Sequence, residues 1–571
     1  MSELYVEAAG HCLDLARGRG LADLLLRNVR LVNVLSGEIH PVDVAIADGV
    51  FLGFGDYPAR EVIECAGRYL VPGLIEGHIH LESSQILPAE FARLVAARGT
   101  AAVVADPHEI ANVMGVAGVE FMLEASAGLP VSFYFMVPSC VPATSMETAG
   151  AVIDAKAVAA LLAKHPDRLL GLAEVMNFPG VINRDPETMA KIAAAQGKKI
   201  DGHAPELSGF ALNSYIMAGP ASDHEATTPA EAREKLRLGM HLMLREGSRE
   251  HNLDDLLPVV NVHNSANCSL VSDDRHVIDL LHKGHLDYSI RKAIAGGLAP
   301  LTAIQMATIN PARYFGLKRR GAVAPGYRAD CVLLDDLENF TIKQVFLAGR
   351  RVVDEAFTVT AKTLPGNTVS LGPLSEKSFA LPASGSRVKV IGIVAGQLVT
   401  RKIVLRPKCS DGLVVSDPER DLAKLAVLER HHGSGRIGLG LVQGLGLKRG
   451  ALAGSVAHDS HNLIVAGVND ADMLLAVRVV KEMGGGLAVV ADGRIRGRLP
   501  LPVAGLMSAE KAETTAAALA LLQEQAALLG AVNEPFMTLS FLALPVIPAL
   551  KLSDQGLVDV DKFCLTDFWE E

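Results

Sequence analysis

The stretch Val71-Pro-Gly-Leu-Ile-Glu-Gly-His-Ile-His80 decides how the rest of the 571-residue chain is interpreted. It begins apolar, as a buried strand does, and it ends in two histidines separated by one residue. Because successive side chains of a strand point to opposite faces, His78 and His80 point the same way. Two imidazoles on one face at a strand end can bind a metal ion, although such a short pair is also typical of ordinary polar residues at the rim of a sheet.

Short apolar runs follow this stretch and alternate with amphipathic segments that predict helices at 88–98, 151–164, 186–197, 287–296 and 301–315. The runs lie at 100–105, 131–137, 169–175, 199–203, 219–224, 240–245 and 269–273. With the opening stretch they make about eight strand–helix units, the number typical of a (β/α)8 barrel. Their continuous apolar character is typical of parallel strands that are buried on both faces.

The barrel is predicted to be inserted between two halves of a small β domain. Short strands with Ser36-Gly37 and Asp48-Gly49 turns follow a helix expected over 3–18, and strands return at 321–353. A Gly/Pro-rich linker over 363–386 precedes a region of mixed strands and helices. We therefore predict an α/β chain with a β-sandwich domain at 1–70 and 320–362, a barrel at 71–319 and a C-terminal α+β domain at 380–571.

The composition indicates which kinds of binding partner and which cellular compartment to expect. A net charge of -10 without a long Lys/Arg run argues against a nucleic-acid partner. No apolar stretch is long enough to span a bilayer, so no membrane partner is expected. Seven scattered cysteines without a CxxC pair predict free thiols, and the first residues lack a signal-peptide pattern, so a cytoplasmic location is expected.

Metal-ligating residue types gather at the predicted strand ends, where barrels of this kind carry their reactive groups. They are His78, His80, Asp106, His108, Glu174, His203, His224 and Asp273. Imidazole and carboxylate suit borderline divalent ions such as Zn, Mn, Fe or Co. Single members have structural explanations, since His203 is also compatible with a turn after Gly202 and Asp273 with a helix N-cap. Their recurrence at successive strand ends favours a metal site.

This constellation resembles the amidohydrolase superfamily of metal-dependent hydrolases over about residues 20–355. Many of its members bridge two metals with a carboxylated lysine on the fourth strand, where this chain has Glu174. A fixed carboxylate can also bridge two cations. The motifs Asp106-Pro-His-Glu-Ile, Arg430-His-His-Gly-Ser and Ser455-Val-Ala-His-Asp-Ser-His-Asn extend the resemblance over nearly the whole chain and are similar to those of the bacterial adenine deaminases.

The resemblance implies hydrolysis of adenine to hypoxanthine and ammonia with two divalent metal ions, Mn or Fe, with Zn as a further candidate. The implied metal ligands are His78, His80, Glu174, His203, His224 and Asp273. The implied catalytic residues are Asp273, Glu174 and His224. Candidates for contact with the purine base are Glu82, Ser83, Asp106, His108 and Glu109. A homo-oligomer, either a dimer or a tetramer, is also expected.

Alternatives stay open at several of these positions. Glu82, Ser83 and Ser84 are also compatible with capping of the next helix, and Asp106-Pro107 with a plain turn. Arg245 is a candidate for a substrate contact or for a structural ion pair. The segment His458-Asp459-Ser460-His461 suits either a lid over a barrel mouth, of its own or of a neighbouring subunit, or a hydrogen-bonded turn.

Two other functions are alternatives to the deaminase hypothesis. One is a hydrolase for a cyclic amide, of the dihydroorotase or hydantoinase kind, against which Glu174 and the C-terminal region argue. The other is a non-catalytic barrel that serves as a scaffold. A scaffold predicts broken ligand positions, whereas every expected position in this chain is filled.

Overall fold

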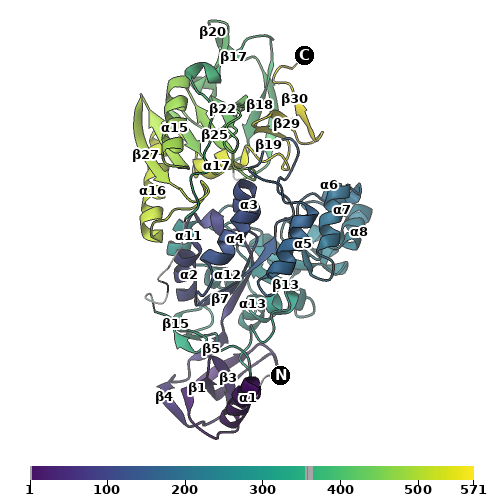
Figure 1. Cartoon of the computed structure of the whole chain (residues 1–571), viewed down its shortest axis with the longest axis vertical. Helices are drawn as coiled ribbons and strands as arrows, with labels where there is room; N and C mark the ends of the chain where they lie inside the picture. The colour runs from purple at the N-terminus through teal and green to yellow at the C-terminus, as the bar shows by residue number, and fades with distance from the viewer. Residues whose placement is uncertain (1–2, 354–356, 358–363, 396, 571) are drawn as a thin grey trace.

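The computed structural model describes residues 3–353, 357, 364–395 and 397–570, and Figure 1 shows three regions stacked along the long axis. A sheet near the N-terminus lies at one end, parallel strands with their helices occupy the middle, and a second large sheet lies at the other end. The leading helix predicted over 3–18 is present as α1 (Glu3–Ala16) and contacts the first sheet.

Two segments that are far apart in the sequence build the first sheet. Its strands are β1 (Ala22–Asn33), β2 (Glu38–Ala47), β3 (Val50–Phe54), β4 (Ala59–Glu64), β5 (Tyr69–Pro72), β14 (Cys331–Leu334), β15 (Ile342–Leu347) and β16 (Arg350–Arg351). Antiparallel pairing of β14 with β5 places Val332 opposite Val71 and joins the two segments. The division at 1–70 and 320–362 stays a prediction, and residues 1–2, 354–356 and 358–362 of it lie outside the described residues.

The opening stretch is divided between two sheets. Residues up to Pro72 belong to β5 of the first sheet, whereas β6 (Leu74–Ile79) begins the parallel strands. Gly73 lies between them, where an added Cβ would come within 2.6 Å of the Ala101 side chain and 2.9 Å of Asp330. Only glycine fits this crossing, so the chain passes directly from one sheet into the other.

All the predicted apolar runs form parallel strands. They are β7 (Thr100–Ala105), β8 (Ser132–Val137), β9 (Leu169–Val175), β10 (Lys199–Gly202), β11 (Ser222–Asp223), β12 (His241–Arg245) and β13 (Cys268–Val271). β6 to β10 form one sheet and β11 to β13 another. A parallel bridge between Ile79 and Asp273 links the first strand to the end of the last, so the strands curl round.

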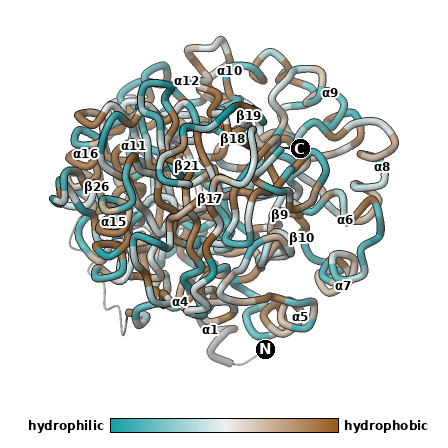
Figure 2. Tube along the Cα trace, turned by 90° about the horizontal axis from the view of Figure 1, so that it is seen from above, coloured by the Kyte–Doolittle hydropathy of each residue, from teal (hydrophilic) through white to brown (hydrophobic). Residues whose placement is uncertain are grey.

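Helices surround these strands. In Figure 2, α5 (Ala155–Lys164), α7 (Pro186–Ala194), α8 (Gly209–Ala218), α9 (Pro229–Arg237) and α12 (Leu286–Ala295) follow one another around the outside, with β9 and β10 inside. Side-chain caps fix their starts, since Asp154 accepts a hydrogen bond from the Ala157 amide and Asp185 from the Thr188 amide. The other helices of this region are α2 (Pro88–Ala97), α3 (His108–Met114), α4 (Val116–Ala125), α6 (Phe178–Ile182), α10 (Leu253–Leu256) and α11 (Val277–His282).

The single helix predicted over 301–315 is wrong. The segment forms two helices, α13 (Pro300–Met306) and α14 (Ile309–Tyr314). Pro311 has no amide hydrogen for the bond back to Ala307, so it is tolerated only in the first turn of a new helix.

The second large sheet has eight strands and forms most of the C-terminal region. Its order is β19 (Thr400–Leu405), β18 (Val388–Ile393), β23 (Ile437–Gln443), β22 (Leu422–Leu428), β25 (Leu463–Gly467), β24 (Ala451–Gly454), β26 (Gly486–Ala491) and β27 (Arg494–Pro500). Helix α15 (Asp470–Glu482) contacts β24, β25 and β26, while α16 (Ala512–Leu528) contacts β27 and α11. Smaller elements complete the region: β17 (Leu381–Pro382), β20 (Lys408–Ser410), β21 (Leu413–Val415), α17 (Pro535–Phe541), β28 (Leu550–Ser553), β29 (Gly556–Asp559) and β30 (Cys564–Thr566).

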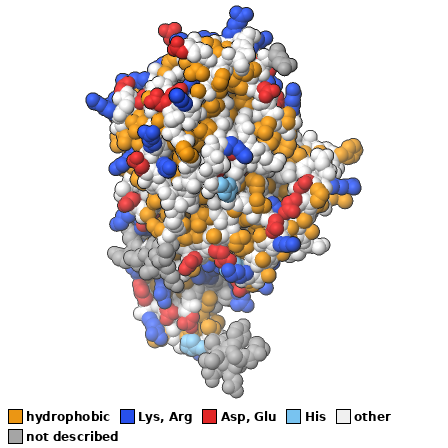
Figure 3. All heavy atoms as spheres, turned by 45° about the horizontal axis from the view of Figure 1, so that its top comes forward, with side chains coloured by type: hydrophobic (Ala, Val, Ile, Leu, Met, Phe, Trp, Pro, Cys, Tyr) orange, Lys and Arg blue, Asp and Glu red, His pale blue; other side chains and the backbone are white. Residues whose placement is uncertain are grey.

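One hydrophobic core runs through the middle region and into the C-terminal one. Alternate residues of β22 take opposite sides: Leu425 and Val427 join the core that includes the parallel strands, whereas Ala426 and Leu428 pack with α15. The C-terminal sheet is therefore fixed against the carboxyl ends of the parallel strands. On the face drawn in Figure 3, acidic and basic side chains are interspersed. Among the described residues, no helix is both long and apolar enough to cross a bilayer.

Candidate metal centre

The six predicted metal ligands gather at one end of the parallel strands. Parallel strands present their carboxyl ends at the same edge, so residues far apart in the chain meet there. In chain order they are His78 in β6, His80 directly after it, Glu174 in β9, His203 directly after β10, His224 directly after β11, and Asp273 two residues past β13. All are buried except His203, which is half-buried.

The His80 ring shows why this cluster suits cations. Its Nδ1 lies 3.1 Å from the carbonyl oxygen of Asp106, which only accepts hydrogen bonds, so Nδ1 carries a proton. In the neutral ring the Nε2 lone pair then faces two carboxylates, at 3.2 Å from Asp273 Oδ1 and 3.5 Å from Glu174 Oε1. Burial and His108 lower the pKa of His80, but the surrounding carboxylates raise it well above its ordinary value. A lone pair aimed at carboxylate oxygens is the arrangement that a bound cation satisfies.

The carboxylate of Glu174 connects two groups of imidazoles. Its Oε2 lies 2.8 Å from Nδ1 of His203 and 3.0 Å from Nε2 of His224, whereas Oε1 faces His80. Burial raises the pKa of Glu174, but His203 and His224 outweigh it and hold the pKa well below its usual range. The side chain is therefore an ionised carboxylate with one oxygen toward each group.

Asp273 is held from the other side by Arg245. The guanidinium donates to Asp273 Oδ2 at 2.6 Å, which leaves Oδ1 toward His78 and His80. Burial raises the pKa of Asp273, but Arg245 and the imidazoles lower it well below its ordinary value. Arg245 also binds Glu225, a residue that sequence reasoning missed although it directly follows His224. Arg245 was a candidate for a substrate contact or for a structural ion pair, and the structure shows the ion pair.

His78 adds an unsatisfied atom to the cluster. Its ring stacks on His224 with centroids 4.2 Å apart, and its Nε2 is buried without a hydrogen-bond partner among the described residues. An unpaired, buried imidazole nitrogen beside a second imidazole is available to ligate a cation.

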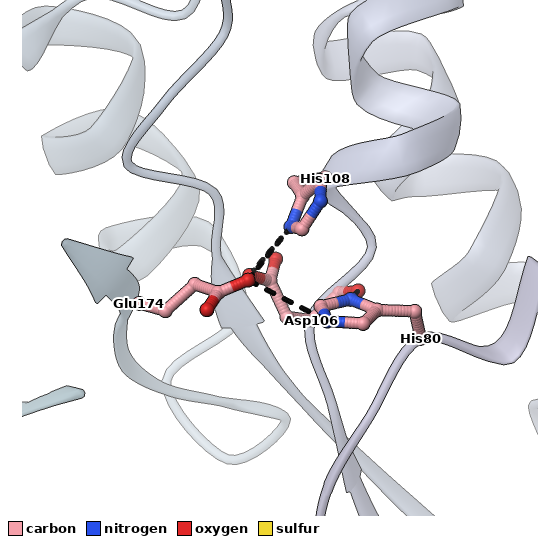
Figure 4. A group of neighbouring side chains, drawn as sticks. All are labelled: His80, Asp106, His108 and Glu174. Atoms are coloured by element: carbon pink, nitrogen blue, oxygen red, sulfur yellow. Dashed lines mark hydrogen bonds and ion pairs between the residues drawn. The ribbon is translucent and has the colours of Figure 1, made fainter. Parts of the chain in front are cut away.

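Asp106 and His108 lie closer to the predicted metal ligands than the sequence indicated. Figure 4 shows both side chains turned toward Glu174 and His80, which come from other strands. His108 Nδ1 lies 2.9 Å from Asp106 Oδ2 and 3.5 Å from Glu174 Oε1, and one ligand atom from each of the four residues lies within 4.8 Å of the others. The turn after β7 is also present, because α3 begins at His108. The pair is thus positioned for either substrate or metal.

Glu82 and Ser83 do not cap the following helix, whose N-cap is Leu87. They form a short 3-10 turn, η1 (Leu81–Ser84), from which the Ser83 hydroxyl donates to Asp274 and Glu82 Oε1 accepts from the Ile110 amide at 3.0 Å. Burial raises the pKa of Glu82 to about 7. Its Oε2 has no hydrogen-bond partner among the described residues, so it is free to contact a ligand. The N-cap alternative for Asp273 also fails, since α11 has His276 as its N-cap.

The segment His458-Asp459-Ser460-His461 reaches the carboxyl ends of the parallel strands in its own chain. Both histidines contact the carboxylate of Glu109. A cavity that is open in part to solvent lies at this junction. It is lined by Glu82, Ser83 and Glu109 from one side and by His458, Phe536 and Met537 among others from the C-terminal side. The C-terminal region therefore forms part of the wall of this cavity.

Two family models match this chain, one over the region of the parallel strands and one over the C-terminal region. Residues 69–352 match the amidohydrolase family, and residues 397–564 match the adenine deaminase C-terminal domain. An adenine deaminase of Oleidesulfovibrio alaskensis is 56% identical over 97% of this chain and 98% of its own length. One of Desulfatibacillum aliphaticivorans is 49% identical over 97% of this chain and 98% of its own.

Among solved structures, the N-acetyl-D-glucosamine-6-phosphate deacetylase of Mycobacterium smegmatis is 19% identical, with a TM-score of 0.45. The similarity covers 58% of this chain and 100% of that one.

Proposed function

The chain belongs to the adenine deaminase family of metal-dependent hydrolases, and from this premise we propose how its buried cluster carries out the reaction. Adenine and water are converted to hypoxanthine and ammonia. We propose that β6 to β13 close into a (β/α)8 barrel flanked by the first sheet as a β-sandwich domain, with two divalent metal ions at its mouth, Mn or Fe, with Zn as a further candidate.

The observation that carries the metal assignment is the tautomer of His80, whose Nε2 lone pair faces the Asp273 and Glu174 carboxylates. The proposed ligands are His78, His80, Glu174, His203, His224 and Asp273. Glu174 is the proposed bridge, because its two oxygens face different imidazoles. Divalent ions held by such ligands supply a water molecule that is activated for attack near neutral pH.

We propose that the Asp273 side chain accepts and transfers the protons of the attacking water. Arg245 donates to Asp273 Oδ2, so we assign the proton of the attacking water to Oδ1, the oxygen that faces His78 and His80. The new bond forms between this water oxygen and C6 of the purine. Asp273 passes this proton to the ring nitrogen beside C6. It then moves the remaining hydroxyl proton to the amine, the bond between C6 and the amine nitrogen breaks, and ammonia leaves while C6 becomes a carbonyl. His224, which lies between Glu174 and the His78 ring, assists by keeping the Glu174 oxygen in place.

We assign the purine contacts to Glu82, Ser83, Asp106, His108 and Glu109. Glu82 supports this most directly, because a carboxyl group with a pKa of about 7 and an unpaired buried oxygen can both donate to and accept from a purine edge. We further propose a cytoplasmic enzyme that assembles as a homodimer or homotetramer. The seven free cysteines support a reducing compartment.

The test uses the full chain loaded with Mn²⁺ or Fe²⁺. Adenine is expected to convert to hypoxanthine, which is read from the shift of the ultraviolet spectrum. Stoichiometric metal binding without turnover of adenine would reject the proposal. Dihydroorotate and hydantoin serve as comparison substrates, although relatives named adenine deaminase over 97% of the chain do not favour a cyclic-amide hydrolase.

A further inference from the structure

A hairpin loop of the C-terminal region extends to the proposed active site. It connects the antiparallel strands β24 and β25 and carries His458 and His461 at its tip. The buried Arg430 side chain holds this loop, because it donates to the carbonyl oxygens of His461 and Ala504. Asn462 ties the loop to the other side of the junction by donating to the carbonyl oxygen of Thr148 at 2.8 Å. The tip is thus fixed from both sides.

The two histidines hold one carboxylate between them. Nδ1 of His458 lies 2.8 Å from Oε1 of Glu109, and Nε2 of His461 contacts Oε2 of the same residue. Glu109 is 2% exposed, so these contacts are shielded from water and from salt. The His458 ring is itself fixed by stacking on Phe541, with centroids 4.4 Å apart.

The tautomer of His461 argues that the two histidines hold Glu109 by charge and contact and do not form a metal site with it. The Ala457 amide donates to Nδ1 of His461 at 3.1 Å, so Nδ1 carries the lone pair and Nε2 carries the proton in the neutral ring. A metal ion would need the lone pair on Nε2, the atom that faces Glu109. Nε2 of His461 therefore faces the Glu109 carboxylate with its N–H and not with a metal-ligating lone pair.

Glu109, held by the two histidines, in turn contacts His108 beside the proposed metal ligands. Its Oε1 lies 3.4 Å from Nε2 of His108, whose Nδ1 in turn contacts Asp106 and Glu174. Glu109 also lines the cavity together with Glu82. A shift of the Glu109 carboxylate would thus move a wall of the cavity and the His108 ring together.

We propose that His458 and His461 are positioning residues for the deamination, which hold Glu109 and through it His108 against the bound purine. The inference rests on the proposed function, because it assigns the cavity to adenine. It makes the C-terminal region part of the catalytic apparatus. The competing interpretation is that the two histidines only bind the two regions of the chain together.

Four variants of the metal-loaded full chain separate these interpretations: His458→Ala, His458→Asn, His461→Ala and His461→Gln. Asparagine keeps a donor near Nδ1, and glutamine keeps one near Nε2. We expect each alanine variant to lower kcat by about 10- to 100-fold, with a smaller change in KM and unchanged metal content. The asparagine and glutamine variants are expected to recover a large part of the lost kcat.

The matched control is His432→Ala. The exposed His432 ring also contacts the other side of the junction, at 3.2 Å from the Ala149 carbonyl oxygen, but does not touch Glu109. Its kcat is expected to stay at the value of the unmodified chain. An equal loss in His432→Ala, an unchanged kcat in both alanine variants, or no recovery in His458→Asn and His461→Gln would overturn the proposal. Loss of a metal equivalent in His461→Ala would also overturn it, whereas an unmodified chain without adenine turnover would reject the proposed function itself.

Discussion

Nε2 of His224 lies 3.0 Å from Oε2 of Glu174, and this contact joins the ends of two strands of the parallel region. The other oxygen of Glu174 faces His80. A single carboxylate therefore meets imidazoles on both of its sides, which is the arrangement required of a bridge between two cations.

Glu174→Gln is expected to abolish most adenine turnover and to weaken metal binding. The amide keeps the size of the side chain but loses the negative charge that faces His203 and His224. The expected loss of metal affinity is at least about 10- to 100-fold, the range found when a group that merely supports a ligand is removed. Metal content and kcat are measured on the same preparation. Glu120→Gln is the control, since Glu120 pairs with Lys164 and His165 away from the cluster. Full activity with normal metal content would refute the bridging role.

Removal of metal by a chelator is expected to lower both activity and thermal stability. Ions that bind only the folded chain stabilise it by about 2.7 kcal/mol per site at a free concentration of 100 times Kd. Without them, the buried Glu174 carboxylate is balanced by the neighbouring imidazoles alone, and Asp273 by imidazoles and Arg245. The midpoint of thermal unfolding and the rate are recorded before chelation, after it, and after Mn²⁺ or Fe²⁺ is returned. An unfolding midpoint that does not respond to chelation or to added metal would contradict the prediction.

The strands, and the clustering of the proposed metal ligands at their ends, were predictable because their signals are local. Buried parallel strands appear as continuous apolar runs, and β7 and β9 have the predicted bounds. The ligands lie where those runs end, so their side chains meet once the strands pair. The turn glycines of the first sheet are equally local, as Asp48-Gly49 lies between β2 and β3.

Contacts between distant segments were not predictable in the same way. No periodicity links Glu109 to His461, and the contact exists only because the C-terminal sheet packs over the strand ends. The Glu225–Arg245 pair was missed because both residues resemble ordinary loop charges in the sequence. The split of the opening stretch at Gly73 depends on a crossing of two sheets, which a single apolar run does not reveal.

Arg245→Met is expected to destabilise the metal-loaded chain by about 3–5 kcal/mol, because it removes the guanidinium that the half-buried Glu225 and the buried Asp273 share. Arg245→Lys keeps the charge but not the planar fork of donors, so a smaller loss is expected. The free energy of unfolding is measured by urea denaturation. Arg351→Ala breaks an exposed ion pair with Glu61 and is expected to cost only about 0–1 kcal/mol. Equal effects of Arg245→Met and Arg351→Ala would show that the buried pair does not stabilise the fold.

Lys551 is expected to make stability depend on pH. Its side chain is fully buried and donates to the carbonyl oxygens of Leu398 and Phe541. Burial lowers the pKa of Lys551 to about 7. Between that value and the ordinary lysine value of about 10.4, the unfolded chain binds a proton that the folded chain does not, so stability rises with pH.

The measurement compares the unmodified chain with Lys551→Met by urea denaturation from about pH 7.5 to about pH 9.5. The unmodified chain is expected to gain about 1.4 kcal/mol per pH unit relative to the variant, because one proton is released on folding. Lys156→Met, at an exposed position on α5, is the control and is expected to leave the pH dependence unchanged. A constant difference between the unmodified chain and Lys551→Met would mean that Lys551 stays protonated in the folded chain.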